Sequence, residues 1–97
     1  NIVHNLREYE PQENAPVAAW AEEFDGLIAR ALRKRDLETL LDFKGVPPEL
    51  LRRAMPTSEH YLPLLYAMGA SRESEPVSFP FEGFQNGSMS MRSVRFG

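Results

Sequence analysis

The chain contains no cysteine, and this absence excludes several kinds of chemistry. Without thiols there is no disulfide framework, no thiolate metal site and no cysteine nucleophile. Any metal ion must therefore be held by nitrogen and oxygen ligands. A chain without cysteine suits a reducing compartment, so we expect a cytoplasmic location.

Long apolar runs and an excess of positive charge are also missing. No segment approaches the roughly 20 apolar residues that span a bilayer. The formal net charge is −3 at pH 7, so the composition offers no electrostatic attraction for nucleic acid or anionic membranes. We therefore expect neither nucleic acid nor a membrane as a partner.

What is present suits one small globular domain, with 97 residues of which 42% are hydrophobic. The chain begins with Asn1 rather than Met, and Ile2 and Val3 are apolar without alternation, which is typical of a buried strand. We expect residues 1–6 to form a short strand inside a sheet. We also expect that an N-terminal region is absent from this sequence.

A long helix is predicted after Pro16, with its apolar residues on one stripe at helical spacing. These residues are Trp20, Phe24, Leu27, Ile28, Ala31 and Leu32. Acidic residues lie early in this helix and basic residues at its end, which complements the helix dipole. We interpret the basic end, residues 30–35, as a solvated helix terminus rather than a nucleic-acid site.

Three shorter helical segments follow. Asp36 is predicted to cap a helix that stops near Gly45, and residues 47–48 are predicted to open a helical turn.

Thr57 is predicted to cap the third segment, which places His60 in its first turn. Pro63 should kink or restart that helix, and Gly69 should end it.

The tail has two β-like runs, at residues 77–84 and 89–96, joined by a tight-turn signal at Asn86-Gly87. The alternation of Met89 and Met91 predicts one strand face packed into the core. The whole order predicts an α/β fold: the C-terminal portion of a mixed-sheet domain, with helices and a terminal β-hairpin.

The sequence has two histidines, His4 and His60, and each lies in a distinctive string. Residues 1–7 read Asn-Ile-Val-His-Asn-Leu-Arg, and residues 56–66 read Pro-Thr-Ser-Glu-His-Tyr-Leu-Pro-Leu-Leu-Tyr. Imidazole is a common metal ligand and changes charge near neutral pH. Two histidines far apart in sequence are more often structural or surface residues, so the residues alone leave a metal site open.

Together these strings resemble the C-terminal part of the class III extradiol ring-cleavage dioxygenases, in the branch that includes 4,5-DOPA dioxygenase. The tail strengthens the resemblance, because residues 82–91 read Glu-Gly-Phe-Gln-Asn-Gly-Ser-Met-Ser-Met. Residues 8–55 match no motif of that family. The resemblance implies that residues 1–97 are the C-terminal part of a single catalytic domain.

That resemblance implies a non-haem metal enzyme that opens a DOPA-like catechol with dioxygen, using Fe(II) for catalysis or holding Zn(II). It implies that His60 is a metal ligand and that His4 is either a ligand or the nearby acid/base. The family's other two histidines come from the N-terminal half, so this chain does not complete the centre alone. We expect the two imidazoles to lie within roughly 8 Å of each other.

Two neighbours of the histidines have competing interpretations. Arg7 can bind a substrate carboxylate, since guanidinium binds carboxylates bidentately, but a structural pairing with a buried acid is an equal alternative. Glu59 is interpreted as a favourable charge at a helix N-terminus rather than as a ligand, because adjacent helical residues point about 100° apart.

Two other functions stay open at this point. One is an interaction protein on the same fold with a degenerate metal site, and the other is a different metal-dependent reaction, such as hydrolysis.

Overall fold

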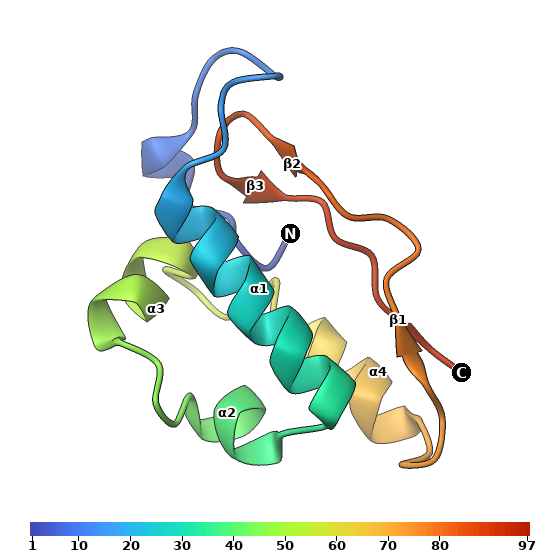
Figure 1. Cartoon of the computed structure of the whole chain (residues 1–97). Helices are drawn as coiled ribbons and strands as arrows, with labels where there is room; N and C mark the ends of the chain where they lie inside the picture. Colours follow the sequence, from blue (N-terminus) through green and yellow to red (C-terminus); the bar gives the residue numbers. More distant parts are fainter.

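Helix α1 (Ala19–Lys34) runs through the middle of the computed structural model, which describes residues 1–97 (Figure 1). The 3₁₀ helix η1 (Leu6–Glu8) precedes it, and α2 (Leu37–Asp42), α3 (Pro48–Ala54) and α4 (Leu62–Ala70) follow it. The tail contains β1 (Val77–Ser78), β2 (Phe84–Gln85), β3 (Met89–Ser90) and β4 (Arg95–Phe96). Helices α2 and α3 lie on one side of α1, and the tail runs along the other (Figure 1). The predicted α/β class with a terminal hairpin is confirmed.

The predicted stripe of α1 forms the centre of the core. Phe24, Ile28 and Leu32 are almost completely buried, whereas Trp20 and Leu27 are half-buried. The helix ends at Arg35, whose φ of 50° is left-handed and whose amide donates to the carbonyls of the preceding turn. Because α1 contacts α2, α3, β1 and β3, its apolar face organises the rest of the chain.

The next two helices begin where the sequence predicts. The Asp36 carboxylate accepts a hydrogen bond of 3.3 Å from the backbone amide of Thr39, so Asp36 caps α2 as expected. Phe43, with a left-handed φ of 53°, ends α2 just before Gly45. Pro48 occupies the start of α3, where its missing N–H costs no helical hydrogen bond.

The prediction for α4 is wrong at its N-terminus. Thr57 does not cap this helix, which begins at Leu62 without a side-chain cap, so His60 lies in the preceding turn. Pro63 falls in the first turn rather than in the interior, where it starts the helix instead of kinking it. Gly69 lies within α4, and the Ser71 hydroxyl donates to the carbonyl of Met68 at the C-terminus.

The predicted strand at residues 1–6 is also wrong. Val3 is completely buried, but its carbonyl accepts from the amide of Ser90, and the next amide, that of His4, donates to the carbonyl of Ala54. The segment therefore bonds to the tail on one side and to the end of α3 on the other. A strand needs a run of pairs with one neighbouring strand, and these contacts are single bonds to two different elements.

The terminal hairpin is confirmed, as a ribbon of two short antiparallel pairs. β2 pairs with β3 next to the turn, and β1 pairs with β4 further along. Asn86 and Gly87 have φ values of 55° and 78°, which an Asn-Gly pair adopts readily. The turn packs on the loop before α1: a Cβ on Gly87 would lie 2.9 Å from Cγ of Glu10.

The buried face of β3 is polar, contrary to the prediction for Met89 and Met91. Both methionines are half-buried, whereas Ser90 is 1% exposed. The Ser90 hydroxyl donates to the carboxylate of Asp25 at 2.5 Å, and Arg92 donates to the same carboxylate at 2.7 Å. These polar groups are buried because each has a partner of opposite charge or a hydrogen-bond acceptor.

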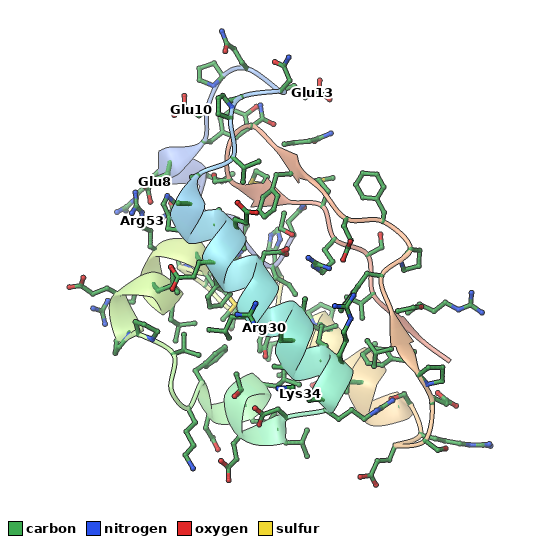
Figure 2. All side chains as sticks on the ribbon, viewed as in Figure 1. Glu8, Glu10, Glu13, Arg30, Lys34 and Arg53 are labelled. Carbon is green, nitrogen blue, oxygen red and sulfur yellow. The ribbon has the colours of Figure 1, made fainter.

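Part of the basic end of α1 holds the tail in place. The guanidinium of Arg33 lies 4.7 Å from the centre of the Phe79 ring, and Arg35 donates to the Ser71 hydroxyl and to the carbonyl of Glu75. Arg30 and Lys34 are exposed along α1 (Figure 2). The interpretation as a solvated terminus therefore holds for two of the four basic residues.

None of the helices is at once long enough and apolar enough to cross a membrane.

The buried Asp25–Arg92 pair predicts a large effect on stability. Asp25→Ala leaves the Ser90 hydroxyl without its acceptor and removes the buried one of the two carboxylates that pair with Arg92, the other being that of Glu82. We expect the free energy of unfolding to fall by about 3–5 kcal/mol, measured by urea denaturation. The control is Glu23→Ala on the exposed face of α1, which should change it by less than about 0.5 kcal/mol. Equal effects of the two substitutions would contradict a stabilising role for the pair.

Candidate metal and catalytic centre

The two histidines meet, although 55 residues separate them in the chain. The rings of His4 and His60 stack with their centroids 4.1 Å apart and their planes inclined by 3°. His4 comes from the N-terminal segment and His60 from the turn before α4. The expected convergence within 8 Å is confirmed.

His4 is the buried member of the stack, with 7% of its surface exposed. Its Nδ1 lies 2.9 Å from the carbonyl oxygen of Ile2, and its Nε2 lies 3.2 Å from Oγ1 of Thr57. Both ring nitrogens are therefore engaged by the protein, and the ring orientation is set by its own segment and by residue 57.

The hydrogen bonds set the direction of each polar contact of the His4 ring. A carbonyl oxygen only accepts, so Nδ1 carries a hydrogen and donates to Ile2. The Thr57 hydroxyl donates its single hydrogen to the Glu59 carboxylate at 2.5 Å, so toward His4 it presents a lone pair. The Thr57 hydroxyl is thus an acceptor, and not a donor, toward Nε2.

His60 has the opposite surroundings. It is exposed, and neither of its ring nitrogens takes part in a hydrogen bond within the chain. One face of its ring is covered by His4, which restrains the ring without occupying its nitrogens. An imidazole held by stacking alone keeps its lone pair available to a metal ion.

Glu59 lies much closer to the histidines than expected. The helical argument that turned it away from His60 does not apply, because both residues lie in a turn before α4. Ligand atoms of His4, Glu59 and His60 all lie within 4.8 Å of one another. The hydrogen bond from Thr57, followed by the backbone amide of Glu59, holds the pKa of Glu59 below its ordinary value of 4.5.

The donor set fits a divalent metal ion in chemical type, because imidazole nitrogen and carboxylate oxygen suit both Fe(II) and Zn(II). The stacked geometry makes His4 and His60 unequal as candidate metal ligands. A metal ion binds in the plane of an imidazole ring, and two parallel stacked planes have no such point in common. The ring nitrogens of His60 make no hydrogen bond within the chain, whereas both ring nitrogens of His4 are held by hydrogen bonds.

A polar hollow of about 510 Å³ opens beside His4. Eight residues line it: His4, Asn5, Leu6, Arg7, Arg52, Pro56, Thr57 and Glu59. Its volume is within the range of about 300–1,000 Å³ that is usual for small-molecule sites. The hollow therefore gives a small polar molecule access to the side of the histidine stack that carries His4 and Thr57.

Arg7 lines this hollow and is exposed, so it lies where the sequence analysis requires a substrate-binding residue. The alternative, a structural pairing with a buried acid, is not found, because Arg7 takes part in none of the ion pairs. Its neighbour Glu8 is paired instead, with Arg53 on α3 (Figure 2).

Thr57 and Arg52 are the functional candidates that sequence reasoning missed. Thr57 was expected to cap a helix, but it joins His4 to Glu59. Arg52 was given no role, yet it borders the hollow from α3. Neither lies in a periodic pattern, because both roles arise from the packing of residues 1–5 against the end of α3.

A histidine stack beside a carboxylate and a polar hollow defines a candidate metal-dependent enzyme on an α/β fold. No family model matches the chain. It is 37% identical over its whole length to a 4,5-DOPA dioxygenase extradiol from Escherichia coli K12 and covers 36% of that protein. It is 32% identical to a protein of the same name from Portulaca grandiflora, with 89% of the chain and 34% of the relative covered.

One solved structure, an uncharacterized protein from Escherichia coli K12, superposes with a TM-score of 0.86 and 36% identity. The match covers all of this chain and 40% of that one. The chain belongs to the 4,5-DOPA dioxygenase branch of the extradiol ring-cleavage dioxygenases. It spans about a third of the length of the curated relatives that it matches.

The contact between Thr57 and Glu59 makes a prediction about the carboxylate. Thr57→Val removes the hydroxyl that donates to Glu59, so the pKa of Glu59 should rise toward 4.5. The measurement is an NMR titration of the side-chain carboxyl carbon. Ser58→Ala removes a neighbouring hydroxyl that makes no bond to this carboxylate and should leave its titration unchanged. An unaltered Glu59 titration in Thr57→Val would show that the hydroxyl does not stabilise the charge.

Proposed function

We propose that this chain forms part of the active site of an extradiol dioxygenase that opens the ring of a DOPA-like catechol with dioxygen. Family membership supports the reaction class, and the names of the relatives support the substrate class. The observation that carries the proposal is the stacking of His4 on His60 with different surroundings for each ring.

His60 is the proposed metal ligand. Its ring is exposed, is positioned by stacking and has nitrogens free of other bonds, and Glu59 places a carboxylate oxygen nearby. A bound divalent ion, Fe(II) for catalysis or Zn(II), supplies the positive charge that favours an ionised catechol and an open position for dioxygen. Further ligands are proposed to come from the protein N-terminal to this segment, with residues 1–97 as the C-terminal part of one catalytic domain.

His4 is the proposed acid/base. We place the proton exchange with a catechol hydroxyl at Nε2, because Nδ1 donates to Ile2 and Nε2 faces Thr57, which lines the adjoining hollow together with His4. The Nδ1–H bond to Ile2 holds the ring in the tautomer that leaves Nε2 for this exchange. Burial limits the water that reaches the ring, so a bound substrate replaces water as its proton-exchange partner.

Arg7 is the proposed residue that binds the substrate carboxylate. It projects from η1, directly after the segment that carries His4. Guanidinium binds carboxylate through two parallel hydrogen bonds, which orients the catechol as well as holding it.

The reaction is tested on the full-length protein loaded with Fe(II) without oxygen and then given a catechol and air. A yellow ring-opened semialdehyde is the expected product. Metal binding without any ring opening would favour a non-catalytic protein on the same fold.

The division of roles between the histidines is tested by two substitutions in the full-length protein. His60→Ala should lower metal content and turnover together, because it removes a ligand. His4→Ala should keep most of the metal but lower single-turnover rates by about 10²–10⁴-fold, the usual contribution of a positioned acid/base. Metal content and single-turnover rate are measured on both variants side by side. Equal metal loss in the two would contradict separate roles, and full activity of His60→Ala would contradict the enzyme.

A further inference from the structure

The hollow beside His4 has a second cation, Arg52, which reaches it from the opposite element. Arg7 borders the hollow from η1 and Arg52 borders it from α3. The only carboxylate among the lining residues is that of Glu59, which accepts from Thr57 and faces His4. Two arginine residues therefore border one small polar space in a protein whose net charge is −3.

A neighbouring ion pair determines which arginines are free. Arg53 donates to both carboxylate oxygens of Glu8, at 2.6 and 2.5 Å, and its guanidinium also lies 4.6 Å from the centre of the Trp20 ring. This contact fastens α3 to η1, as Figure 2 shows for Glu8 and Arg53. The guanidinium of Arg53 is therefore occupied by its contacts with Glu8 and Trp20.

The same contact places the adjacent residues of both elements together. Arg7 precedes Glu8 and Arg52 precedes Arg53, and successive residues point about 120° apart in a 3₁₀ helix and about 100° apart in an α-helix. Arg7 and Arg52 therefore point in other directions than the paired residues, and both line the hollow. Neither arginine takes part in an ion pair of the chain.

The backbone around the hollow supports this arrangement. The Asn5 side chain accepts from the amide of Arg7 and donates to the carbonyl of Arg53 at 2.7 Å. One buried side chain therefore bridges the two elements that carry the cations. Their spacing is set by the fold rather than by the flexible side chains alone.

We propose that Arg52 is a specificity-determining residue that, together with Arg7, binds the carboxylate of the catechol substrate. This inference rests on the proposed function for the identity of the substrate, and it adds the residue that distinguishes acidic catechols from neutral ones. Guanidinium groups on two sides of one hollow suit a carboxylate, which is negatively charged and whose planar shape matches the planar guanidinium fork. The hollow holds the carboxylate end while the catechol end reaches Nε2 of His4.

The experiment compares DOPA with dopamine, which has the same catechol and amine but no carboxylate. In the full-length Fe(II)-loaded protein, Arg52→Gln should raise KM for DOPA by about 10- to 100-fold, the usual loss for a hydrogen bond to a charged group. Its kcat for DOPA, and both constants for dopamine, should change little. Arg52→Lys keeps the charge but loses the planar fork, so it should fall between the wild type and Arg52→Gln.

Arg72→Gln is the matched control, because Arg72 is exposed, lies far along the chain and does not border the hollow. It should behave as the wild type with both substrates. Equal KM changes for DOPA and dopamine in Arg52→Gln, or no change for either, would overturn the proposal while leaving the dioxygenase activity established.

If no ring opening occurs, a binding measurement tests the carboxylate subsite separately from the dioxygenase reaction. Calorimetry without oxygen compares 3-(3,4-dihydroxyphenyl)propionate with 4-ethylcatechol, its neutral counterpart. Tighter binding of the acid that is lost in Arg52→Gln supports the carboxylate subsite even if the proposed reaction fails. Equal binding of acid and neutral catechol to the wild type, or an acid preference that survives in Arg52→Gln, overturns it.

Discussion

The structure depends on how the N-terminal segment is held between the tail and the end of α3. The carbonyl of Val3 accepts from Ser90, the amide of His4 donates to Ala54, and the side chain of Asn5 donates to the carbonyl of Arg53. The side chain of Val3 is completely buried in the core. These bonds fix the position of the N-terminal segment, although it pairs with no neighbouring strand. Everything proposed for the site follows from this placement, because it brings His4 against His60 and η1 against α3.

The consequence is a pair of identical side chains with different chemistry. His4 is buried with both nitrogens engaged, and His60 is exposed with both free. Stacking joins the two rings but keeps their planes apart, so the rings have no common in-plane point at which one metal ion could bind both. Thr57 adds direction to the pair, because its single hydroxyl hydrogen goes to Glu59, so the hydroxyl can only accept from Nε2 of His4.

Polar contacts join the elements as much as the apolar core does. Asp25 on α1 holds Ser90 and Arg92 of the tail, and Glu8 holds Arg53 across the N-terminal segment. The Asp25 contacts are buried, so their stability contribution is large when one partner is removed. The Glu8–Arg53 contact is more exposed, and it joins η1 to α3, the two elements whose residues Arg7 and Arg52 border the hollow.

The sequence by itself determined the features that are local. The stripe of α1, the cap at Asp36 and the Asn86-Gly87 turn were predictable because each depends on residues within a few positions. The histidine strings identified the family and the two rings. Only the tertiary structure decided that residues 1–6 form no strand, that Glu59 faces the histidines, and that Thr57 and Arg52 border the hollow. Those features come from contacts between segments about 50 or more residues apart, such as His4 with Thr57, and no periodicity records such contacts.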